Sequence, residues 1–143
     1  MPRKARERSA TGCYHIMGRG INHAAIYNDD ADNMNFLHIL DFCADEDFTI
    51  FAYCLMGNHF HLLAKADADV LQHVMKAVGI RYVAYFNRRY QRDGPLFRGR
   101  YNSQPVTTKG YFLRVLRYIH RNPVAAGIVQ EMQDYPWSSY LDY

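Results

Sequence analysis

This sequence has few cysteines, no long apolar run and, across one long stretch, almost no acidic residues. No segment approaches the roughly 20 apolar residues that a helix needs to cross a bilayer, so we expect no membrane span. No apolar stretch follows the basic N-terminus, which argues against a signal peptide and for a cytoplasmic protein. The cysteines lack the paired spacing of a disulfide framework or a zinc site, so we interpret them as buried thiols: Cys13, Cys43 and Cys54.

Acidic residues are nearly absent between residues 76 and 121, where eleven lysines and arginines are accompanied only by Asp93. Residues 20–75 have the opposite balance, with nine acids and one lysine. Aromatic residues are interleaved with the arginines of the basic stretch. This mixture suits an unpaired nucleic-acid strand, because guanidinium groups bind phosphate and aromatic rings stack on bases. For any single arginine, a solvated helix face is the more common explanation.

The composition, with 49% hydrophobic and 15% aromatic residues, predicts a folded globule, and the length fits a single domain over residues 1–143. Residues 1–10 are predicted to form a mobile basic arm. Period-two patterning predicts strands, and helical spacing predicts helices. The strands are expected over residues 13–17, 48–56, 59–65 and 101–106, and the helices over 29–47, 70–90 and 107–121. We expect Pro123 to end or kink the third helix at Asn122.

The order strand, helix, strand, strand, helix, strand is the split βαβ, or ferredoxin-like, arrangement. The predicted fold class is therefore α+β, with a four-stranded, mostly antiparallel sheet and packed helices. The third helix would carry the C-terminal tyrosine discussed below. Because this fold has many functions, the function must be argued from particular residues.

His59 and His61 are separated by a single apolar residue. Side chains on a strand alternate between faces, so both imidazoles would project from the same face, which we expect to lie near the surface. Two neutral imidazoles side by side form half of a metal site, although surface strands also carry histidines that bind nothing. The remaining histidines lack this spacing, and we interpret them as ordinary: His15, His23, His38, His73 and His120.

Catalytic zinc normally takes three protein ligands from His, Cys, Asp or Glu, and no Asp, Glu or Cys lies within a few residues of the histidine pair. An oxygen-rich site for Mg²⁺ or Mn²⁺, completed by an amide oxygen and by phosphate oxygens, suits these residues better. Tyr118 and Asn122 are four residues apart and would share one face of the third helix with Tyr111 and Arg114. A helical tyrosine more often belongs to the core, and a phenol becomes a good nucleophile only when its surroundings favour the phenolate.

Four segments, in the same order, resemble the single-tyrosine HUH transposases of small insertion sequences, and most of all the REP-associated tyrosine transposases. They are MGNHFHLL, YFNRRY, GPLFRGRY and RYIHRNPVAAG, at residues 56–63, 85–90, 94–101 and 117–127. The resemblance covers nearly the whole chain, although Gly57 stands where a proline is common. It implies that His59, His61 and Asn122 hold a metal and that Tyr118 is the nucleophile.

The resemblance further implies metal-dependent cleavage and rejoining of single-stranded DNA, with Mg²⁺ or Mn²⁺ as cofactor and a DNA hairpin as substrate. Tyr118 would attack a backbone phosphate and leave a 5′-phosphotyrosine and a free 3′-hydroxyl. Some relatives complete each site with the partner's tyrosine helix, so a monomer and a homodimer both stay open. The arginines expected to bind the DNA are Arg81, Arg88, Arg89, Arg98, Arg100, Arg114 and Arg117.

Two other functions are compatible with the same residues. One is a ferredoxin-like module that binds single-stranded nucleic acid without any chemistry. The other is a metal-dependent phosphodiesterase that uses water as the nucleophile. A covalent protein–DNA adduct would distinguish the transposase from both.

Overall fold

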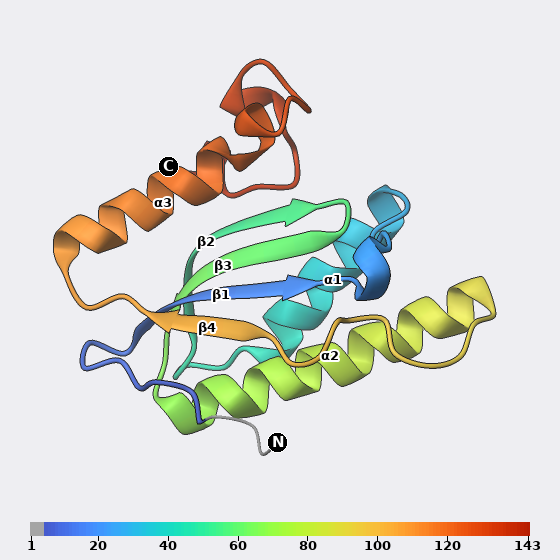
Figure 1. Ribbon diagram of the computed structural model, residues 1–143, viewed down its shortest axis with the longest axis horizontal. Helices are drawn as coiled ribbons and strands as arrows, with labels where there is room; N and C mark the ends of the chain where they lie inside the picture. Colours follow the sequence, from blue (N-terminus) through green and yellow to red (C-terminus); the bar gives the residue numbers. More distant parts are fainter. Residues whose placement is uncertain (1–4) are drawn as a thin grey trace.

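A computed structural model describes residues 5–143, in which four strands form one open sheet (Figure 1). The order of the strands across the sheet is β2-β3-β1-β4, and every neighbouring pair is antiparallel. This arrangement confirms the predicted α+β class and its four-stranded antiparallel sheet. The strands are β1 (Cys13–Arg19), β2 (Thr49–Met56), β3 (His59–Lys65) and β4 (Asn102–Pro105).

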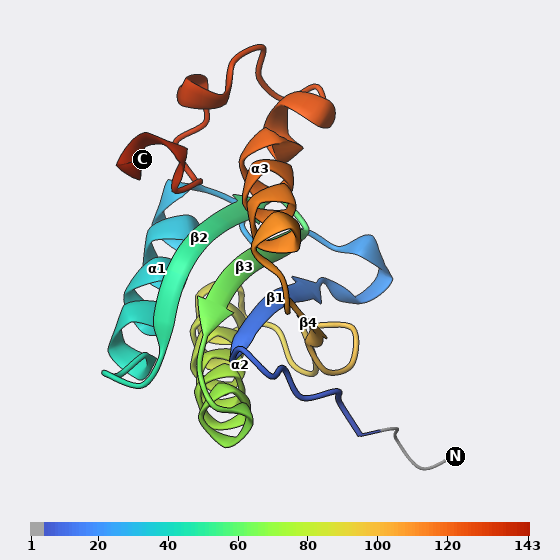
Figure 2. The same ribbon diagram turned by 90° about the vertical axis from the view of Figure 1, so that its left-hand side faces the viewer.

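Helices cover both faces of this sheet. Figure 2 shows α1 and α2 on one face and α3 on the other. Side-chain oxygens of Asp29 and Thr108 accept backbone hydrogen bonds at the starts of α1 and α3, as preferred N-cap residues do. None of the helices within residues 5–143 is long and apolar enough to cross a membrane. The three α-helices are α1 (Asp30–Cys43), α2 (Ala68–Tyr90) and α3 (Lys109–Ala125).

Two predicted helix ends were wrong. The first helix stops at Cys43 instead of continuing to residue 47, because the Asp45 side chain accepts a hydrogen bond from the Asp47 amide and stabilises a turn there. The third helix continues through Pro123 to Ala125. It ends where Gly127 adopts a left-handed conformation and the amides of residues 127 and 128 bond back to the carbonyls of residues 124 and 123. This Schellman motif stops the helix one turn later than the proline was expected to.

The two faces of the sheet bury different sets of side chains. Phe60, Leu62 and Ala64 of β3 belong to a large core beneath α1 and α2. A glycine is needed at position 18 because a Cβ there would lie 2.3 Å from the Phe60 ring. The opposite face has a small core between the sheet and α3. That core consists of Ala52, Cys54, Met56, Leu63, Val106, Val115 and Ile119.

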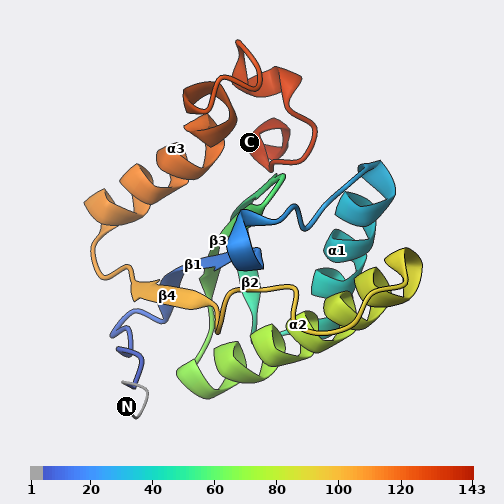
Figure 3. The ribbon, with the colours of Figure 1, turned by 45° about the vertical axis from the view of Figure 1, so that its right-hand side comes forward.

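Both ends of the described chain lie against this body. The predicted mobile arm is described only from Ala5, because residues 1–4 lie outside the described part, and its mobility stays a prediction. Arg6 lies 3.8 Å over the Tyr101 ring and donates to the Tyr101 carbonyl. At the other end, the segment after α3 returns to the edge of β2 (Figure 3). All three cysteines are free thiols, but only Cys54 is fully buried as predicted.

Candidate active site

The start of β3 places His59 and His61 on the sheet face that α3 covers. Their ring centroids are 5.2 Å apart, as expected for side chains two residues apart on a strand. His59 is half-buried, but His61 is only 3% exposed. The expectation that both histidines lie near the surface was therefore wrong for His61, because α3 and the side chains of β1 cover it.

Helix α3 brings Tyr118 to the same place. The centroid of its ring is 5.4 Å from that of His61, and the side chain is 54% exposed, so the hydroxyl is open to a substrate. Tyr111, two turns earlier on the helix, instead packs half-buried against the small core, with Arg114 over its ring. Tyr118 and the histidine pair, which the sequence singled out separately, therefore meet within one chain.

His15 of β1 joins this cluster, although its position in the sequence gave no reason to select it. Its Nε2 lies 3.0 Å from Nδ1 of His61, and the two rings are stacked. Its ring centroid is 6.0 Å from that of Tyr118. The signal is the antiparallel pairing of β1 with β3, which puts His15 opposite Leu63 and therefore diagonally across the strands from His61. That register is a tertiary feature, so spacing along the chain could not reveal it.

The three imidazoles are neutral at physiological pH. Burial lowers the pKa of each, and for His61 the neighbouring His15 and His59 lower it further, to about 3. The Asn58 side-chain oxygen lies 2.7 Å from Nδ1 of His59, so we assign the proton to that nitrogen and a lone pair to Nε2. If His61 likewise donates from Nδ1 to His15, its Nε2 also has a lone pair. Hydrogen bonds of this kind orient metal-binding histidines.

Asn122 follows Tyr118 by four residues on α3, and Nδ2 of its amide is buried without a hydrogen-bond partner. Rotating the amide by 180° would put its oxygen at that unpartnered position, where it could act as a ligand. Asn122 does not line the cleft that holds His59, His61 and Tyr118. No three His, Cys, Asp or Glu side chains within residues 5–143 have metal-binding geometry. A divalent metal would therefore need an amide or the substrate to complete its ligands.

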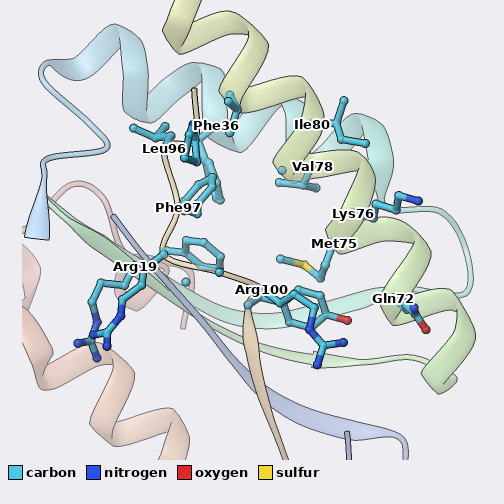
Figure 4. Close-up of a pocket in the computed structure, with 18 of the residues that line it drawn as sticks. Arg19, Phe36, Gln72, Met75, Lys76, Val78, Ile80, Leu96, Phe97 and Arg100 are labelled. Carbon is cyan, nitrogen blue, oxygen red and sulfur yellow. The ribbon is translucent and has the colours of Figure 1, made fainter. Parts of the chain in front are cut away.

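The site lies in a cleft of about 570 Å³ that adjoins a second cleft of about 720 Å³. Gly18, Arg19, Arg98 and Arg100 line both. Figure 4 shows the second cleft, where Phe97, Met75 and other apolar side chains lie between α2 and the segment before β4. Its lining has five basic residues and no acidic ones: Arg6, Arg19, Lys76, Arg98 and Arg100.

The seven arginines expected to bind DNA are not gathered on one surface. Only Arg98 and Arg100 line the cleft of Tyr118. Those of α2 lie across the sheet from those of α3 (Figure 2). Arg81 packs over the exposed Phe42 ring, and Arg114 packs over Tyr111. Two others, Arg88 and Arg117, are exposed.

Arg89 forms ion pairs within the protein. It contacts the carboxylates of Asp29 and Asp32, each at 2.6 Å. Burial alone would raise the pKa of Asp32, but hydrogen bonds from Tyr90, the Asn28 amide, Tyr85 and Arg89 lower it. A fully buried carboxylate needs such partners, so we expect Arg89 to connect α1 and α2 more than to bind phosphate.

The sequence matches the model of the IS200-like transposase family over residues 9–122. A match over so much of the chain shows that the protein belongs to the IS200-like transposase family, and it confirms the resemblance that the four segments indicated. No curated protein matches the chain.

Solved structures that share the fold include two transposases. A REP-associated tyrosine transposase bound to a REP hairpin aligns with a TM-score of 0.76 and 16% identity, over 99% of this chain and 84% of that chain. A candidate transposase from Deinococcus radiodurans R1 aligns with a TM-score of 0.51 and 19% identity, over 85% of this chain and 95% of that chain. At these identities the likeness concerns the fold alone.

Proposed function

We propose that this protein cleaves and rejoins single-stranded DNA beside a hairpin, through a covalent intermediate on Tyr118. The observation that supports this most is the exposed phenol of Tyr118 next to the histidine pair, 5.4 Å from His61 between ring centroids. Membership of the IS200-like transposase family supports a DNA-processing activity. The hairpin bound to the structurally similar REP-associated transposase supports a hairpin as the substrate.

The proposed reaction is a pair of transesterifications. The Tyr118 oxygen attacks a backbone phosphorus, the bond from phosphorus to the 3′ oxygen breaks, and the phenol proton ends on the released 3′-hydroxyl. The 5′ phosphate stays on Tyr118. Attack by the same or another 3′-hydroxyl then reverses the step and releases the phenol. Because each step exchanges one phosphate ester for another, ATP is not required.

We propose that His59 and His61 hold Mg²⁺ or Mn²⁺, and that Asn122, which does not line the cleft but has an unpartnered amide, turns toward it to supply a third ligand. When bound, the metal would polarise the scissile phosphate and stabilise the charge that develops on it. The chain's own contribution is to keep the two imidazoles neutral by burial and to fix their orientation through Asn58 and His15.

The two adjoining clefts offer a path for the DNA. Arg19, Arg98 and Arg100 form their common wall, so a phosphate backbone that follows these cations would pass the Tyr118 hydroxyl. The apolar interior of the second cleft suits an unpaired base, because aromatic and aliphatic side chains stack on bases of any sequence. A duplex would keep its bases paired and would gain nothing from this cleft.

A denaturing gel tests the proposal. The wild-type protein, incubated with a labelled hairpin oligonucleotide and Mg²⁺, should yield a covalent adduct and a shortened strand. Tyr118→Phe keeps the ring, so it should bind the hairpin but form no adduct. Tyr111→Phe, on the same helix but against the small core, is the matched control and should keep the adduct. An adduct that survives in Tyr118→Phe would contradict the assignment.

The other outcomes identify the alternative functions. Cutting that depends on metal but never yields an adduct would indicate a phosphodiesterase that uses water. Hairpin binding without any cutting would indicate a binding module.

A further inference from the structure

The last segment of the chain, residues 135–143, runs along the free edge of β2, and we call it the C-terminal strap. The Leu55 amide donates to the Trp137 carbonyl at 2.8 Å, and the Ser139 amide donates to the Tyr53 carbonyl at 3.0 Å. Cys54 and Ser138 form an antiparallel bridge. The strap therefore adds a short stretch of sheet pairing at the edge that α3 crosses.

The strap contacts α3 at His120, whose ring lies 5.6 and 5.2 Å from the rings of Tyr140 and Tyr143 between centroids, and one strap side chain adds a hydrogen bond. Ser139 is 4% exposed, and its hydroxyl lies 2.8 Å from Nε2 of His120. The same hydroxyl accepts from the Tyr53 amide at 2.9 Å and lies 3.3 Å from the Tyr53 carbonyl. A hydroxyl has one donor and two acceptor positions, so it is fully satisfied if Nε2 of His120 donates to it and it donates to the carbonyl. The Ser139 hydroxyl then links α3 to the backbone of β2.

The position of His120 on α3 relates this hydrogen bond to the direction of Tyr118. Successive residues of a helix are about 100° apart, so His120 and Tyr118 point about 200° apart around the axis. Accordingly, His120 is 6% exposed and faces the strap, whereas Tyr118 is 54% exposed and faces the histidine cleft. Fixing one of these directions fixes the other.

Apolar packing beneath α3 cannot fix the rotation so well. The sheet residues there include the small side chains Ala52 and Cys54, which meet Val115 and Ile119 of the helix. Hydrophobic contact between such side chains is non-directional, whereas a hydrogen bond depends on both distance and angle. The strap is held in turn by the Trp137 indole, which donates to Asp30 at the start of α1 at 3.1 Å.

We propose that Ser139 and His120 are positioning residues, which hold α3 so that Tyr118 faces the histidines of its own chain. A single chain then completes the site without a partner's helix. The catalytic consequence rests on the proposed function, but the positioning itself does not. Neither residue touches the reacting atoms.

Fluorine NMR tests the positioning without any DNA. With 3-fluorotyrosine at position 118, the rings of His15 and His61, at 6.0 and 5.4 Å, should shift its resonance from that of an exposed fluorotyrosine. Ser139→Ala should move the resonance toward the exposed value, and Ser139→Thr, which keeps a hydroxyl, should restore it. Ser138→Ala is the matched control, because Ser138 is also buried in the strap but its hydroxyl bonds only within the strap, to the Tyr140 amide.

An unchanged resonance in Ser139→Ala, or an equal change in Ser138→Ala, would overturn the positioning role. The hairpin assay then measures the catalytic consequence. Ser139→Ala should slow adduct formation about 10- to 100-fold, the loss expected when a reacting group is misplaced by about an ångström, while hairpin binding is retained. Ser139→Thr should recover most of the rate, which a loss of general stability would not explain.

A mixture of two inactive variants tests completion within one chain. Tyr118→Phe chains keep the histidines, and His59→Ala/His61→Ala chains keep the tyrosine. If α3 stays on its own sheet, the mixture forms no adduct, whereas an adduct would mean that chains exchange α3 and would overturn this part of the proposal. If the wild-type protein forms no adduct, the proposed function is contradicted but the positioning role is not. The fluorine resonance, which is measured without DNA, still tests the positioning role.

Discussion

The two faces of the sheet use the same strands for opposite purposes. Beneath α1 and α2, the Phe36 ring lies 5.1 Å from that of Phe60 and 5.2 Å from that of Tyr82 between centroids, within the large apolar core. On the other face, α3 covers only a small apolar cluster, and the remaining area carries polar side chains. In β3 alone, Phe60 and Leu62 serve the first face, and His59 and His61 serve the second.

Neighbouring residues of β3 therefore have different roles: those on one face stabilise the fold, and those on the other face form the candidate active site. The core beneath α1 and α2 contains most of the buried apolar side chains, so the second face can hold buried imidazoles that contribute little packing. The helix on the second face packs against a smaller apolar core, and hydrogen bonds of the C-terminal strap supplement that packing. The comparison therefore predicts large effects on activity from one face and large effects on stability from the other.

The largest expected effect is loss of cleavage when both histidines of β3 are removed. His59→Ala/His61→Ala should fold, because the core beneath α1 and α2 is untouched, and it should cut no hairpin at any Mg²⁺ concentration. Hairpin binding should persist, since Arg98 and Arg100 remain. A gel-shift assay and a denaturing gel measure both quantities. Undiminished cleavage by this variant would eliminate the proposed metal site.

The largest expected effect on stability comes from the neighbouring residue. Phe60→Ala should lower the free energy of unfolding by about 3–5 kcal/mol, because it removes a buried ring and leaves a cavity. His61→Ala, one residue away on the other face, should cost about 1–2 kcal/mol, typical of a buried side chain in a less densely packed region. Urea denaturation monitored by circular dichroism compares the two. Equal losses would mean that the faces do not differ as proposed.

Much of this organisation could be predicted from the sequence, because it depends on local periodicity. Alternation in β3 put His59 and His61 on one face, and helical spacing put Tyr118 and Asn122 on one face of α3. The helical spacing that predicted α2 matches its buried side chains, which recur every three or four residues: Leu71, Val74, Met75, Val78, Tyr82 and Phe86.

What could not be predicted depends on contacts between distant segments. His15 joins the site through the pairing of β1 with β3, and Arg89 reaches Asp32 because α1 packs on α2. The third helix continues through Pro123, where the proline ring is buried, although a proline removes one backbone hydrogen bond and crowds the preceding turn. Local propensity sets the order of elements, but tertiary packing decides such details.

A moderate effect of pH on stability should come from the face with the histidines. His61 is neutral in the folded state because its pKa is about 3, but in the unfolded chain it takes up a proton below about pH 6.5. The unfolded state therefore binds more protons, and stability falls as the pH is lowered from about 6.5 toward 3. Between pH 7 and pH 5, His61 should account for about 2 kcal/mol.

His61→Gln tests this assignment, because glutamine cannot titrate. Urea denaturation at pH 7 and pH 5 should show a smaller loss of stability in the variant than in the wild-type protein. His15 and His59, whose pKa values are also lowered by burial, account for the loss that persists. An equal loss in both proteins would mean that His61 is protonated in the folded state, contrary to its burial.

The smallest expected effect distinguishes two arginines that the sequence treated alike. Arg98 lines both clefts, whereas Arg89 contacts Asp29 and the fully buried Asp32. If Arg98 neutralises one phosphate of a single strand, Arg98→Ala should reduce the slope of log affinity against log salt by about 0.7, because one fewer counterion is released. Its affinity for a hairpin should fall only modestly at moderate salt, where such contacts are already weakened.

Arg89→Ala should have the complementary result. Its salt slope should match that of the wild-type protein, while its urea midpoint falls, because the buried carboxylate of Asp32 loses its cation and keeps only neutral donors and a backbone amide. Fluorescence anisotropy with a labelled hairpin over a series of salt concentrations gives both slopes. If Arg89→Ala lowered the slope as much as Arg98→Ala, the DNA would have to reach α2 on the far side of the sheet. The basic residues would then serve both faces, and the separation of stability from chemistry would not extend to the arginines.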